Sequence, residues 1–328
     1  MVRFGLLGAG RIGKLHGGNI AASPDAKLVA IADVVAEAAD ALAAATGAEA
    51  RSADAIIAAD DIDAILIGTS TDTHADFIEQ AVKAGKAVLC EKPVDLDAKR
   101  IESCLEVVDA SGKPLMVGFN RRFDPNFAAL KKRLDDGAVG AVEMVTIVSR
   151  DPGPPPIAYI ERSGGLYRDM MIHDFDLARF LLGEEPVEVH AIGSVLVDPA
   201  IGKAGDVDTA MVMLRTESGK LCQISCSRRA TYGYDQRIEV HGSDGMIRAG
   251  NLHETTVEVA NGKGFTSDPV LNFFLERYGM AYRLELAAFI DAVKNGTQPS
   301  PSGRDGLMAQ RLADAATKAR ETGQPVKL

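Results

Sequence analysis

The chain has 328 residues, of which 46% are apolar and 25% are charged, and its formal net charge at pH 7 is −10. This length exceeds what one ordinary hydrophobic core needs and predicts two domains, while the composition argues against long disordered stretches. The negative net charge and the lack of a cluster of basic residues argue against a nucleic-acid partner. No apolar run is long enough to span a membrane.

The amino-terminal segment and the cysteines predict a cytoplasmic protein. Glycines and Arg11 interrupt MVRFGLLGAG before a long apolar region develops, which is not typical of a signal peptide. The four cysteines, Cys90, Cys104, Cys222 and Cys226, show no disulfide-framework spacing. Cys222 and Cys226 fall on one predicted strand, roughly 13 Å apart, which is too far for a disulfide. We therefore expect four reduced thiols.

The first 120 residues alternate short apolar strands with helical patterns. Strands are predicted at residues 2–8, 27–33, 62–69, 86–93 and 114–120. Helices are predicted at residues 12–22, 35–45, 73–84 and 95–110, the last two of which stop near glycines. Strands that alternate with helices predict an α/β domain with a doubly wound parallel sheet of the Rossmann type over residues 1–120.

Residues 121–328 have a different pattern. Helices are predicted near residues 124–135, 167–182, 281–294 and 305–322, and a strand at 141–150 precedes a proline-rich loop at 151–156. Residues 186–259 read as consecutive strands with hairpin signals at 217–220 and 242–245. This half is therefore predicted to be an α+β domain with a mostly antiparallel sheet. Alternating apolar positions in residues 207–215 suggest that both sheet faces are partly apolar, so we expect a homo-oligomer.

A glycine-rich turn follows the first predicted strand and opens the first helix. Its sequence is Gly-Ala-Gly-Arg-Ile-Gly, residues 8–13. Gly8 permits a tight turn, Gly10 lets a pyrophosphate approach the backbone, and Gly13 lets the helix pack closely on the strand. Free N–H groups at the helix N-terminus would bind the phosphates. This context predicts a dinucleotide site that includes Arg11 and Ile12; the alternative is a structural turn that binds nothing.

Asp33 stands at the end of the second predicted strand, 20 residues after Gly13. Its carboxylate can accept hydrogen bonds from the adenosine ribose hydroxyls, and its charge would repel a 2′-phosphate. The next residues are Val34 and Val35 rather than an arginine. Asp33 therefore favours NAD over NADP; the alternative is that it only caps a turn.

The Glu91-Lys92-Pro93 segment lies at the carboxyl end of a predicted strand. Ligands bind at that edge of doubly wound sheets, so Lys92 can donate hydrogen bonds to a substrate oxygen. A solvated surface lysine is the alternative. His74, at the start of a helix, is either structural or close to the cofactor.

Asp169 and His173 lie four residues apart in a predicted helix, and Asp176 continues the same face. The rest of this helix is largely apolar, so we expect it to be buried, where unpaired charge is costly. A histidine beside a carboxylate is suited to general-base work near neutral pH. A structural Asp–His pair explains the pattern equally well. No histidine or cysteine pair lies near His173, so no metal site is predicted.

The order of these motifs resembles the Gfo/Idh/MocA oxidoreductases over essentially the whole chain. The motifs are GAGRIGKLH, TSTDTH, EKP and GGxxxDxxxH. Residues 118–127, 149–156 and 163–181 are similar to bacterial members of the family that act on myo-inositol. One departure is Ser70, where many members have proline; this concerns loop rigidity rather than cofactor binding.

The resemblance implies a Rossmann domain followed by a domain with an open-faced sheet, and a homotetramer built through those sheets. It implies that Lys92, Asp169 and His173 form the catalytic constellation. The expected cofactor contacts are Gly8, Gly10, Arg11, Ile12, Gly13, Asp33, Thr69, Ser70, His74, Glu91 and Lys92. The expected substrate contacts are Lys92, Arg150, Asp151, Asp169, His173, Asp176, Tyr232 and Tyr234.

The expected reaction is oxidation of a secondary hydroxyl of a cyclic polyol with hydride transfer to NAD. We expect myo-inositol as substrate and 2-keto-myo-inositol as product. Alternatives are scyllo-inositol or a glucose-type aldose as substrate. A more distant alternative is a non-enzymatic NAD-binding regulator, which would not need the proton-transfer pair Asp169 and His173.

Overall fold

The computed structural model describes all residues from Met1 to Leu328 and divides into two compact units. The first unit contains Met1–Asn120 and Tyr282–Gln310, and the second contains Arg121–Ala281 and Arg311–Leu328. The sequence predicted a division into residues 1–120 and 121–328. It did not predict that residues 282–310 return to the first unit. The return is stabilised by apolar packing, since the ring centroids of Phe289 and Phe4 lie 6.0 Å apart.

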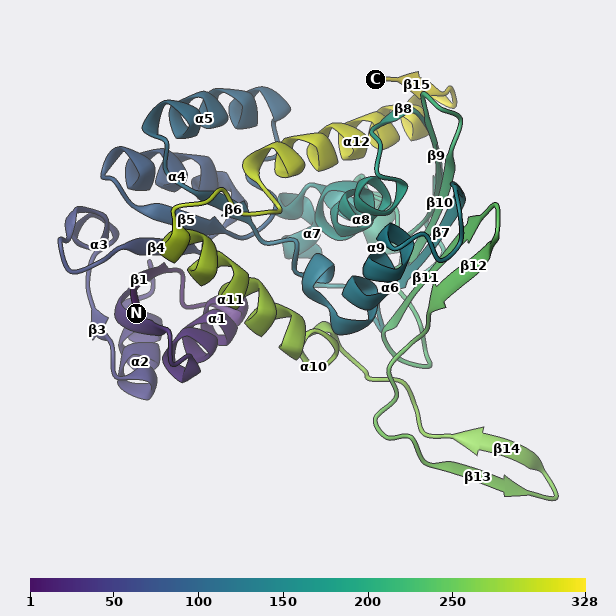
Figure 1. Cartoon of the computed structure of the whole chain (residues 1–328), viewed down its shortest axis with the longest axis horizontal. Coiled ribbons are helices and arrows are strands. Elements are labelled where there is room, and N and C mark those ends of the chain that lie inside the picture. Colours follow the sequence, from purple (N-terminus) through teal and green to yellow (C-terminus); the bar gives the residue numbers. More distant parts are fainter. The chain divides into compact units, whose positions relative to one another are not determined.

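The first unit is built on a six-stranded sheet in the order β3-β2-β1-β4-β5-β6, with every neighbouring pair parallel (Figure 1). Its strands are β1 (Val2–Leu7), β2 (Ala26–Ala32), β3 (Glu49–Ala50), β4 (Ala64–Ile67), β5 (Ala87–Cys90) and β6 (Leu115–Val117). Its helices are α1 (Arg11–Ala22), α2 (Ala36–Thr46), α3 (Ala53–Ala58), α4 (His74–Lys83) and α5 (Ala98–Ser111), with a 3-10 turn, η1 (Thr71–Thr73), before α4. The predicted doubly wound parallel sheet is confirmed. Every residue of β4 and β5 is buried, as expected for central parallel strands covered on both faces.

The two carboxyl-terminal helices are α11 (Gly279–Asn295) and α12 (Gly303–Thr322), close to the predicted ranges. The short helix α3 was not predicted, because six residues are too few to show a clear helical period.

The second unit is built on a seven-stranded sheet in the order β12-β11-β7-β10-β9-β8-β15. These strands are β7 (Val142–Arg150), β8 (Pro186–Ser194), β9 (Thr209–Thr216), β10 (Leu221–Ser227), β11 (Asp235–Gly242), β12 (Gly245–Ala249) and β15 (Val326–Lys327). Only the pair β7 and β10 is parallel, so the prediction of a mostly antiparallel sheet is confirmed. Both predicted hairpin turns are present, between β9 and β10 and between β11 and β12.

The remaining helices of this unit are η2 (Asn120–Phe123), α6 (Pro125–Asp135), α7 (Ile157–Ser163), α8 (Ile172–Leu182), α9 (Pro199–Lys203) and α10 (Phe274–Arg277). Helix α8 packs against β7 and β10 on one face of the sheet. On the other face alternate side chains are exposed, among them Met211 and Met213 of β9. This outward-facing surface is the open face of the sheet.

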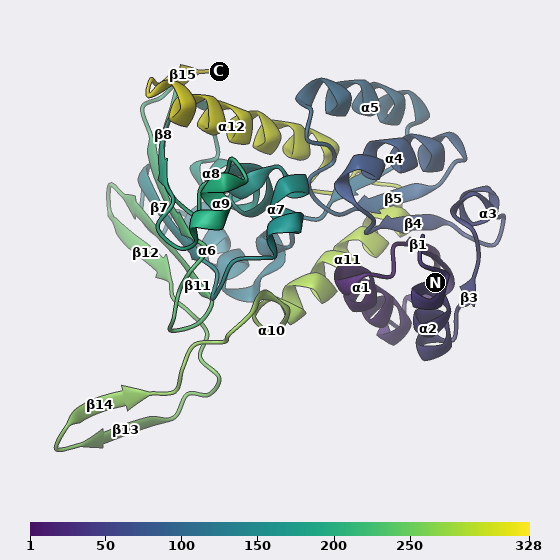
Figure 2. The ribbon, with the colours of Figure 1, turned by 180° about the vertical axis from the view of Figure 1, so that it is seen from behind.

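The strand run predicted to end near residue 259 is wrong in its last part. The sheet ends with β12, and the chain then forms a separate two-stranded hairpin from β13 (Glu258–Asn261) and β14 (Gly264–Ser267). Figure 2 shows this hairpin extending away from the seven-stranded sheet of its unit. All of its strand residues are exposed, so it contributes nothing to the core.

The single regular helix predicted over residues 167–182 is also wrong in its first turn. Leu166–Met170, labelled η3, forms a π-helical turn, and α8 begins only at Ile172. The N–H of Met171 donates to the carbonyl of Leu166, five residues back, rather than four. Turns of this kind are frequent at functional sites. The predicted placement of Asp169 and His173 on one helical face requires α-helical spacing, which this turn does not have.

All four cysteines are buried and free of disulfides. None of the helices combines the length and the apolar character needed to cross a membrane.

Candidate active site

The glycine-rich turn between β1 and α1 requires glycine at two positions. Gly8 has a φ of +100°, and a Cβ added there would lie 2.5 Å from the carbonyl oxygen of Gly68. A Cβ on Gly13 would lie 2.0 Å from the carbonyl oxygen of Gly8. By contrast, no atom lies within 4 Å of a Cβ added to Gly10, which caps the N-terminus of α1. The space over Gly10 and the free N–H groups of this helix end fit a pyrophosphate.

Asp33 is anchored directly beside this turn. Its Oδ2 accepts a hydrogen bond of 2.6 Å from the N–H of Ala9, and its Oδ1 accepts one of 2.8 Å from the N–H of Val35. The carboxylate is partly exposed, and each oxygen retains a further lone pair. Asp33 therefore both stabilises the turn and remains able to bind ribose hydroxyls, so the two interpretations of this residue are compatible.

His74 connects the loops that follow β4 and β5. Its Nδ1 lies 2.8 Å from the carbonyl oxygen of Pro93, and its Nε2 lies 3.2 Å from that of Thr69. Burial lowers the pKa of His74, which favours the neutral ring, and a neutral ring donates to only one of these two carbonyls. The hydroxyl of Thr73 donates to the carbonyl of Ser70 at 2.8 Å, and its oxygen lies 2.7 Å from the hydroxyl oxygen of Thr69. These bonds fix the loop that carries Thr69 and Ser70.

Glu91 and Lys92 follow β5 directly and have different environments. Lys92 is partly exposed, whereas Glu91 is buried. Glu91 Oε1 lies 2.7 Å from Nε2 of His16, a buried residue of α1. Its Oε2 accepts a hydrogen bond of 3.3 Å from the backbone N–H of Lys92. Both carboxylate oxygens of Glu91 thus have partners within the protein, and through them Glu91 shapes the loop that carries Lys92.

In the second unit, Asp169 is held by two side chains that sequence reasoning missed. The hydroxyl of Tyr159 donates to its Oδ1 at 2.9 Å, and Nη2 of Arg228 lies 3.5 Å from its Oδ2. Arg228 is only 1% exposed, an unusual burial for an arginine, and it lies where β10 has just ended. No local pattern around Arg228 predicts its proximity to Asp169, since they are far apart in sequence.

Asp151 belongs to the same neighbourhood. Burial raises the pKa of Asp151 to about 6; Arg228 lowers it and Asp169 raises it. Its backbone N–H donates to the carbonyl of Ser227 at 2.9 Å, which ties the proline-rich loop to the end of β10. A carboxyl group that titrates near neutral pH is able to bind hydroxyls as either donor or acceptor. Asp151 and His173 are both partly exposed, whereas Asp174, the residue after His173, is fully buried.

The helix carboxylates at 174 and 176 neutralise the consecutive arginines before α6. Asp174 pairs with Arg121, and both side chains are almost completely buried. Oδ2 of Asp176 accepts a hydrogen bond of 2.8 Å from Nε of Arg122, and its Oδ1 accepts one of 2.5 Å from Nη2. Asp176 is 1% exposed, so its carboxylate serves the arginine rather than a ligand. Neither ion pair was predicted from the sequence, because the partners lie more than 50 residues apart.

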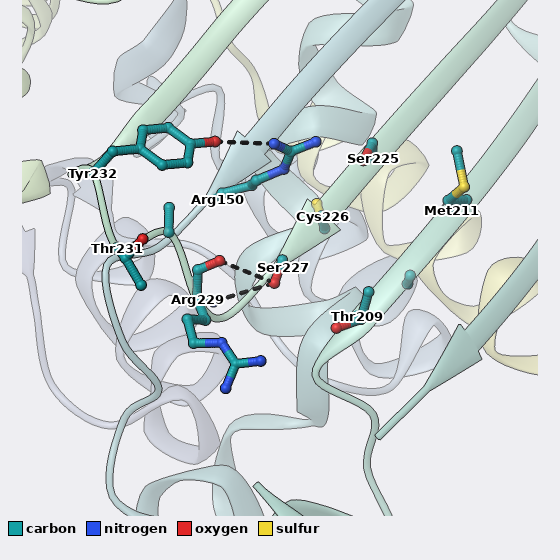
Figure 3. A pocket seen from close by; sticks show the side chains of 11 residues that line it. Arg150, Thr209, Met211, Ser225, Cys226, Ser227, Arg229, Thr231 and Tyr232 are labelled. Atoms are coloured by element: carbon teal, nitrogen blue, oxygen red, sulfur yellow. Dashed lines mark hydrogen bonds between the residues drawn. The ribbon is translucent and has the colours of Figure 1, made fainter. Parts of the chain in front are cut away.

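Arg150 and Tyr232 lie on the open face of the sheet, away from Asp151 and Asp169. Figure 3 shows them lining a surface pocket with Met211 and Ser225. Nη1 of Arg150 donates to the hydroxyl of Tyr232 at 2.9 Å. Because successive side chains of a strand alternate between faces, Arg150 at the end of β7 and the following Asp151 point in opposite directions.

Tyr234, the other tyrosine named from the sequence, is only 6% exposed. Its ring meets that of Tyr278 edge-on, with centroids 5.9 Å apart. The expected substrate contacts of the second unit are therefore divided between the open face of the sheet and the buried side that α8 covers.

Comparison with known proteins identifies the family. Residues 2–119 match the model of the oxidoreductase family with an NAD-binding Rossmann fold, and residues 127–248 match the GFO/IDH/MocA C-terminal domain. The chain belongs to the Gfo/Idh/MocA oxidoreductases. Its cofactor is NAD, in agreement with the open glycine turn and the anchored Asp33. It is an NAD-dependent dehydrogenase.

Relatives of known name align over nearly their whole length. The chain is 59% identical over 318 residues to the inositol 2-dehydrogenase of Rhizobium meliloti (strain 1021), covering 97% of this chain and 96% of that protein. It is 47% identical to the myo-inositol 2-dehydrogenase of Thermotoga maritima, covering 100% and 98%. A crystal structure of a myo-inositol dehydrogenase from Corynebacterium glutamicum superposes with a TM-score of 0.96 at 47% identity, covering 100% and 99%.

Proposed function

We propose that this chain oxidises the secondary hydroxyl at carbon 2 of an inositol, with myo-inositol as substrate and 2-keto-myo-inositol (scyllo-inosose) as product. The observation that carries this proposal is the identity of 59% to a named inositol 2-dehydrogenase over 97% of the chain. When bound, NAD⁺ accepts a hydride from the ring carbon. The glycine turn and Asp33 would hold its pyrophosphate and its adenosine ribose.

His173 is proposed as the general base that removes the proton of the reacting hydroxyl. It is partly exposed on a helix whose other residues, apart from Phe180, are buried, so it is accessible to a small ligand. Asp169 is proposed to orient His173 and to stabilise its charged form, as a carboxylate partner does in other histidine sites. The hydrogen bond from Tyr159 and the ion pair with Arg228 support this role, because they restrict the carboxylate to one position.

Lys92 is proposed to donate a hydrogen bond to the reacting oxygen and to stabilise negative charge that develops on it. Its place immediately after a buried central strand supports this, since ligands bind beyond the carboxyl ends of such strands. The fixed loop around it limits the motion of its backbone.

Asp151 is proposed as a contact for a further substrate hydroxyl. Arg150, Tyr232, Tyr234 and Asp176 are omitted from the proposed substrate set. The first two lie on the open face of the sheet, Tyr234 is packed in the core, and Asp176 is paired with Arg122.

The protein is further proposed to act as a homotetramer in the cytoplasm, in the breakdown of inositol. The apolar side chains on the open face support association with other copies, because such a surface is costly to leave in water. Four unpaired cysteines support a reducing compartment.

The test of the proposed reaction is NADH formation by the purified protein with myo-inositol, scyllo-inositol, and glucose as separate substrates. We expect the highest kcat/KM with myo-inositol and NAD⁺, and isolation of the 2-keto product. Preferred oxidation of glucose would contradict the proposal, and so would NAD⁺ binding without turnover of any of these polyols.

A further inference from the structure

The open face of the sheet contains a polar pocket that the proposed reaction does not use. The pocket has a volume of about 410 Å³, which is within the usual range of small-molecule sites. It lies where β7 and β10 end and β9 begins, and Ser227 pairs in register there with both Arg150 and Thr209. No aspartate or glutamate is among its lining residues, so its wall carries cationic and hydroxyl groups but no carboxylate.

Arg229 brings an uncompensated positive charge to the pocket. It is exposed and forms no ion pair, and its side chain donates a hydrogen bond of 3.1 Å from Nη2 to the carbonyl oxygen of Leu196. The other N–H groups of the guanidinium remain free to donate. A carbonyl group does not neutralise a guanidinium, so Arg229 retains its attraction for an anion.

A second positive charge remains in excess around Arg150. Its Nη1 donates to the hydroxyl of Tyr232 at 2.9 Å and lies 3.5 Å from Oδ2 of Asp235. Arg237 donates to the same carboxylate twice, from Nε at 2.7 Å and from Nη2 at 3.0 Å. One carboxylate therefore serves two guanidinium groups. Asp235 is itself fully buried, so it does not repel a ligand by direct contact.

Hydroxyl groups occupy the space between the two arginines. In Figure 3 the guanidinium groups of Arg150 and Arg229 lie at opposite ends of the pocket, and the hydroxyl of Ser227 lies between them. Ser225 and Thr231 also line the pocket, and neither hydroxyl is engaged in a hydrogen bond. A free hydroxyl is able to donate to a ligand hydroxyl or to accept from it, so the middle of the pocket suits a polyhydroxy compound.

We propose that this pocket is a second ligand site, which binds a small polyhydroxy compound with an anionic group at each end. Guanidinium groups bind carboxylates and phosphoryl groups through charge-assisted hydrogen bonds, and the separation of the two arginines favours two anionic groups over one. The net charge of the protein is −10, so the two uncompensated arginine charges make this part of the surface an exception that attracts anions.

The pocket is separate from the candidate active site and from the most apolar part of the open face. Helix α8, which carries His173, packs on the opposite face of the sheet. On the open face, the exposed Met144 and Leu221 are register neighbours toward the other end of β7 and β10. Met211, which lines the pocket, lies at the boundary. The surface proposed for association with other copies therefore extends away from the polar pocket.

The test is calorimetric titration of the full-length protein saturated with NADH, which occupies the glycine turn. Glucarate, gluconate and sorbitol share a six-carbon polyol chain and carry two, one and no terminal carboxylates. A hexitol 1,6-bisphosphate carries a phosphoryl group at each end instead. We expect glucarate or the bisphosphate to bind once per chain and at least ~10-fold more tightly than gluconate, and the tighter of these two compounds identifies the anionic group. If neither binds more tightly than gluconate, the proposal is wrong.

Substitution of the arginines locates the site. Arg229→Met and Arg150→Met should each weaken binding of the tighter compound ~10-fold or more, because each removes a charge-assisted hydrogen bond. The matched control is Arg248→Met, since Arg248 is an exposed arginine of β12 opposite Glu239 and outside the pocket; it should bind as the wild type does. Unchanged binding by Arg229→Met would contradict the proposed site. If Arg150→Met does not fold, Arg229→Met decides alone, because its guanidinium bonds only a backbone carbonyl.

Two further measurements distinguish other occupants of the pocket. His173→Ala should bind the tighter compound as the wild type does, and loss of binding would place the ligand in the candidate active site instead. Light scattering gives the mass of Arg229→Met. A mass below that of the wild type, together with no binding of either two-ended compound, would assign the pocket to a contact between copies and overturn the ligand site. Neither readout depends on turnover, so a failure of the proposed inositol oxidation would not change these results.

Discussion

Asp33 illustrates how one side chain is able to combine a structural and a binding role. Its two oxygens each accept one backbone N–H, from Ala9 and Val35, which sets the carboxylate beside the glycine turn. Replacement by serine removes the negative charge that disfavours a 2′-phosphate. We expect Asp33→Ser to reduce the preference for NAD⁺ over NADP⁺ roughly tenfold, which corresponds to about 1.4 kcal/mol. Initial rates with both cofactors measure this, with the exposed Asp40→Ser as control. Unchanged preference would show that Asp33 only stabilises the turn.

Substitution of His173 and Asp169 tests their proposed roles in proton transfer. His173→Ala should lower kcat by ~10²–10⁴-fold, the usual contribution of a positioned general base. NAD⁺ affinity, measured by titration, should stay the same because the glycine turn belongs to the other unit. Asp169→Asn should also be slow, and the double variant no slower than the worse single one, because residues that act as a unit are non-additive. Near-normal turnover of His173→Ala would mean that another group accepts the proton.

Asp151 links the candidate site to pH. Because its pKa is raised to about 6, the folded state holds a proton that the unfolded state releases between pH 4 and pH 6. The free energy of unfolding should thus decrease across this window by at most about 3 kcal/mol relative to Asp151→Asn, and then become level. Urea titrations of both proteins at several pH values measure the difference. A constant difference from pH 4 to pH 7 would show that Asp151 is already ionised at pH 4.

At the scale of elements, the packing of α1 on β1 depends on Gly13. A Cβ there would lie 2.0 Å from the carbonyl oxygen of Gly8, whereas one on Gly18 of the same helix meets nothing within 4 Å. Gly13→Ala should therefore destabilise the protein by about 1–3 kcal/mol and weaken NAD⁺ binding, because the turn must shift. Gly18→Ala should instead stabilise it by about 0.5–1 kcal/mol. Thermal unfolding and NAD⁺ titration of both variants test this; equal behaviour of the two would refute the packing argument.

Sequence periodicity predicted a regular α-helix where the structure has the π-helical turn Leu166–Met170. Asp169 lies in this turn, and His173 lies in the first turn of α8 after it. The i, i+4 spacing selected both residues as candidates, but their relative orientation follows from the local backbone and not from an ideal helix. Contacts from Tyr159 and Arg228 fix Asp169 instead.

At the scale of the whole molecule, the open face of the sheet is the basis for the proposed assembly. Met211 and Met213 are 43% and 59% exposed on β9. We expect Met211→Lys and Met213→Lys together to convert the proposed tetramer to smaller species, because buried unpaired charge in an interface is costly. Light scattering measures the mass, with Leu284→Lys, an exposed apolar residue outside the sheet, as control. A wild type that is monomeric at micromolar concentration would refute the assembly itself.

The sequence by itself determined the features that depend on neighbours along the chain. The glycine turn, Asp33 and the alternating strands and helices of the first 120 residues are contiguous strand–turn–helix patterns, so local periodicity was sufficient to predict them. The hairpins joining β9 to β10 and β11 to β12 were found from turn residues for the same reason.

Only the tertiary structure decided the features that depend on contacts distant in sequence. Residues 282–310 belong to the first unit, where Phe289 packs on Phe4. Arg228 is buried beside Asp169. The side chains of the adjacent residues Arg150 and Asp151 lie on opposite sides of the sheet, because neighbouring side chains of a pleated strand point to opposite faces. Such contacts are settled by packing and by the pairing of buried charges, which no local pattern contains.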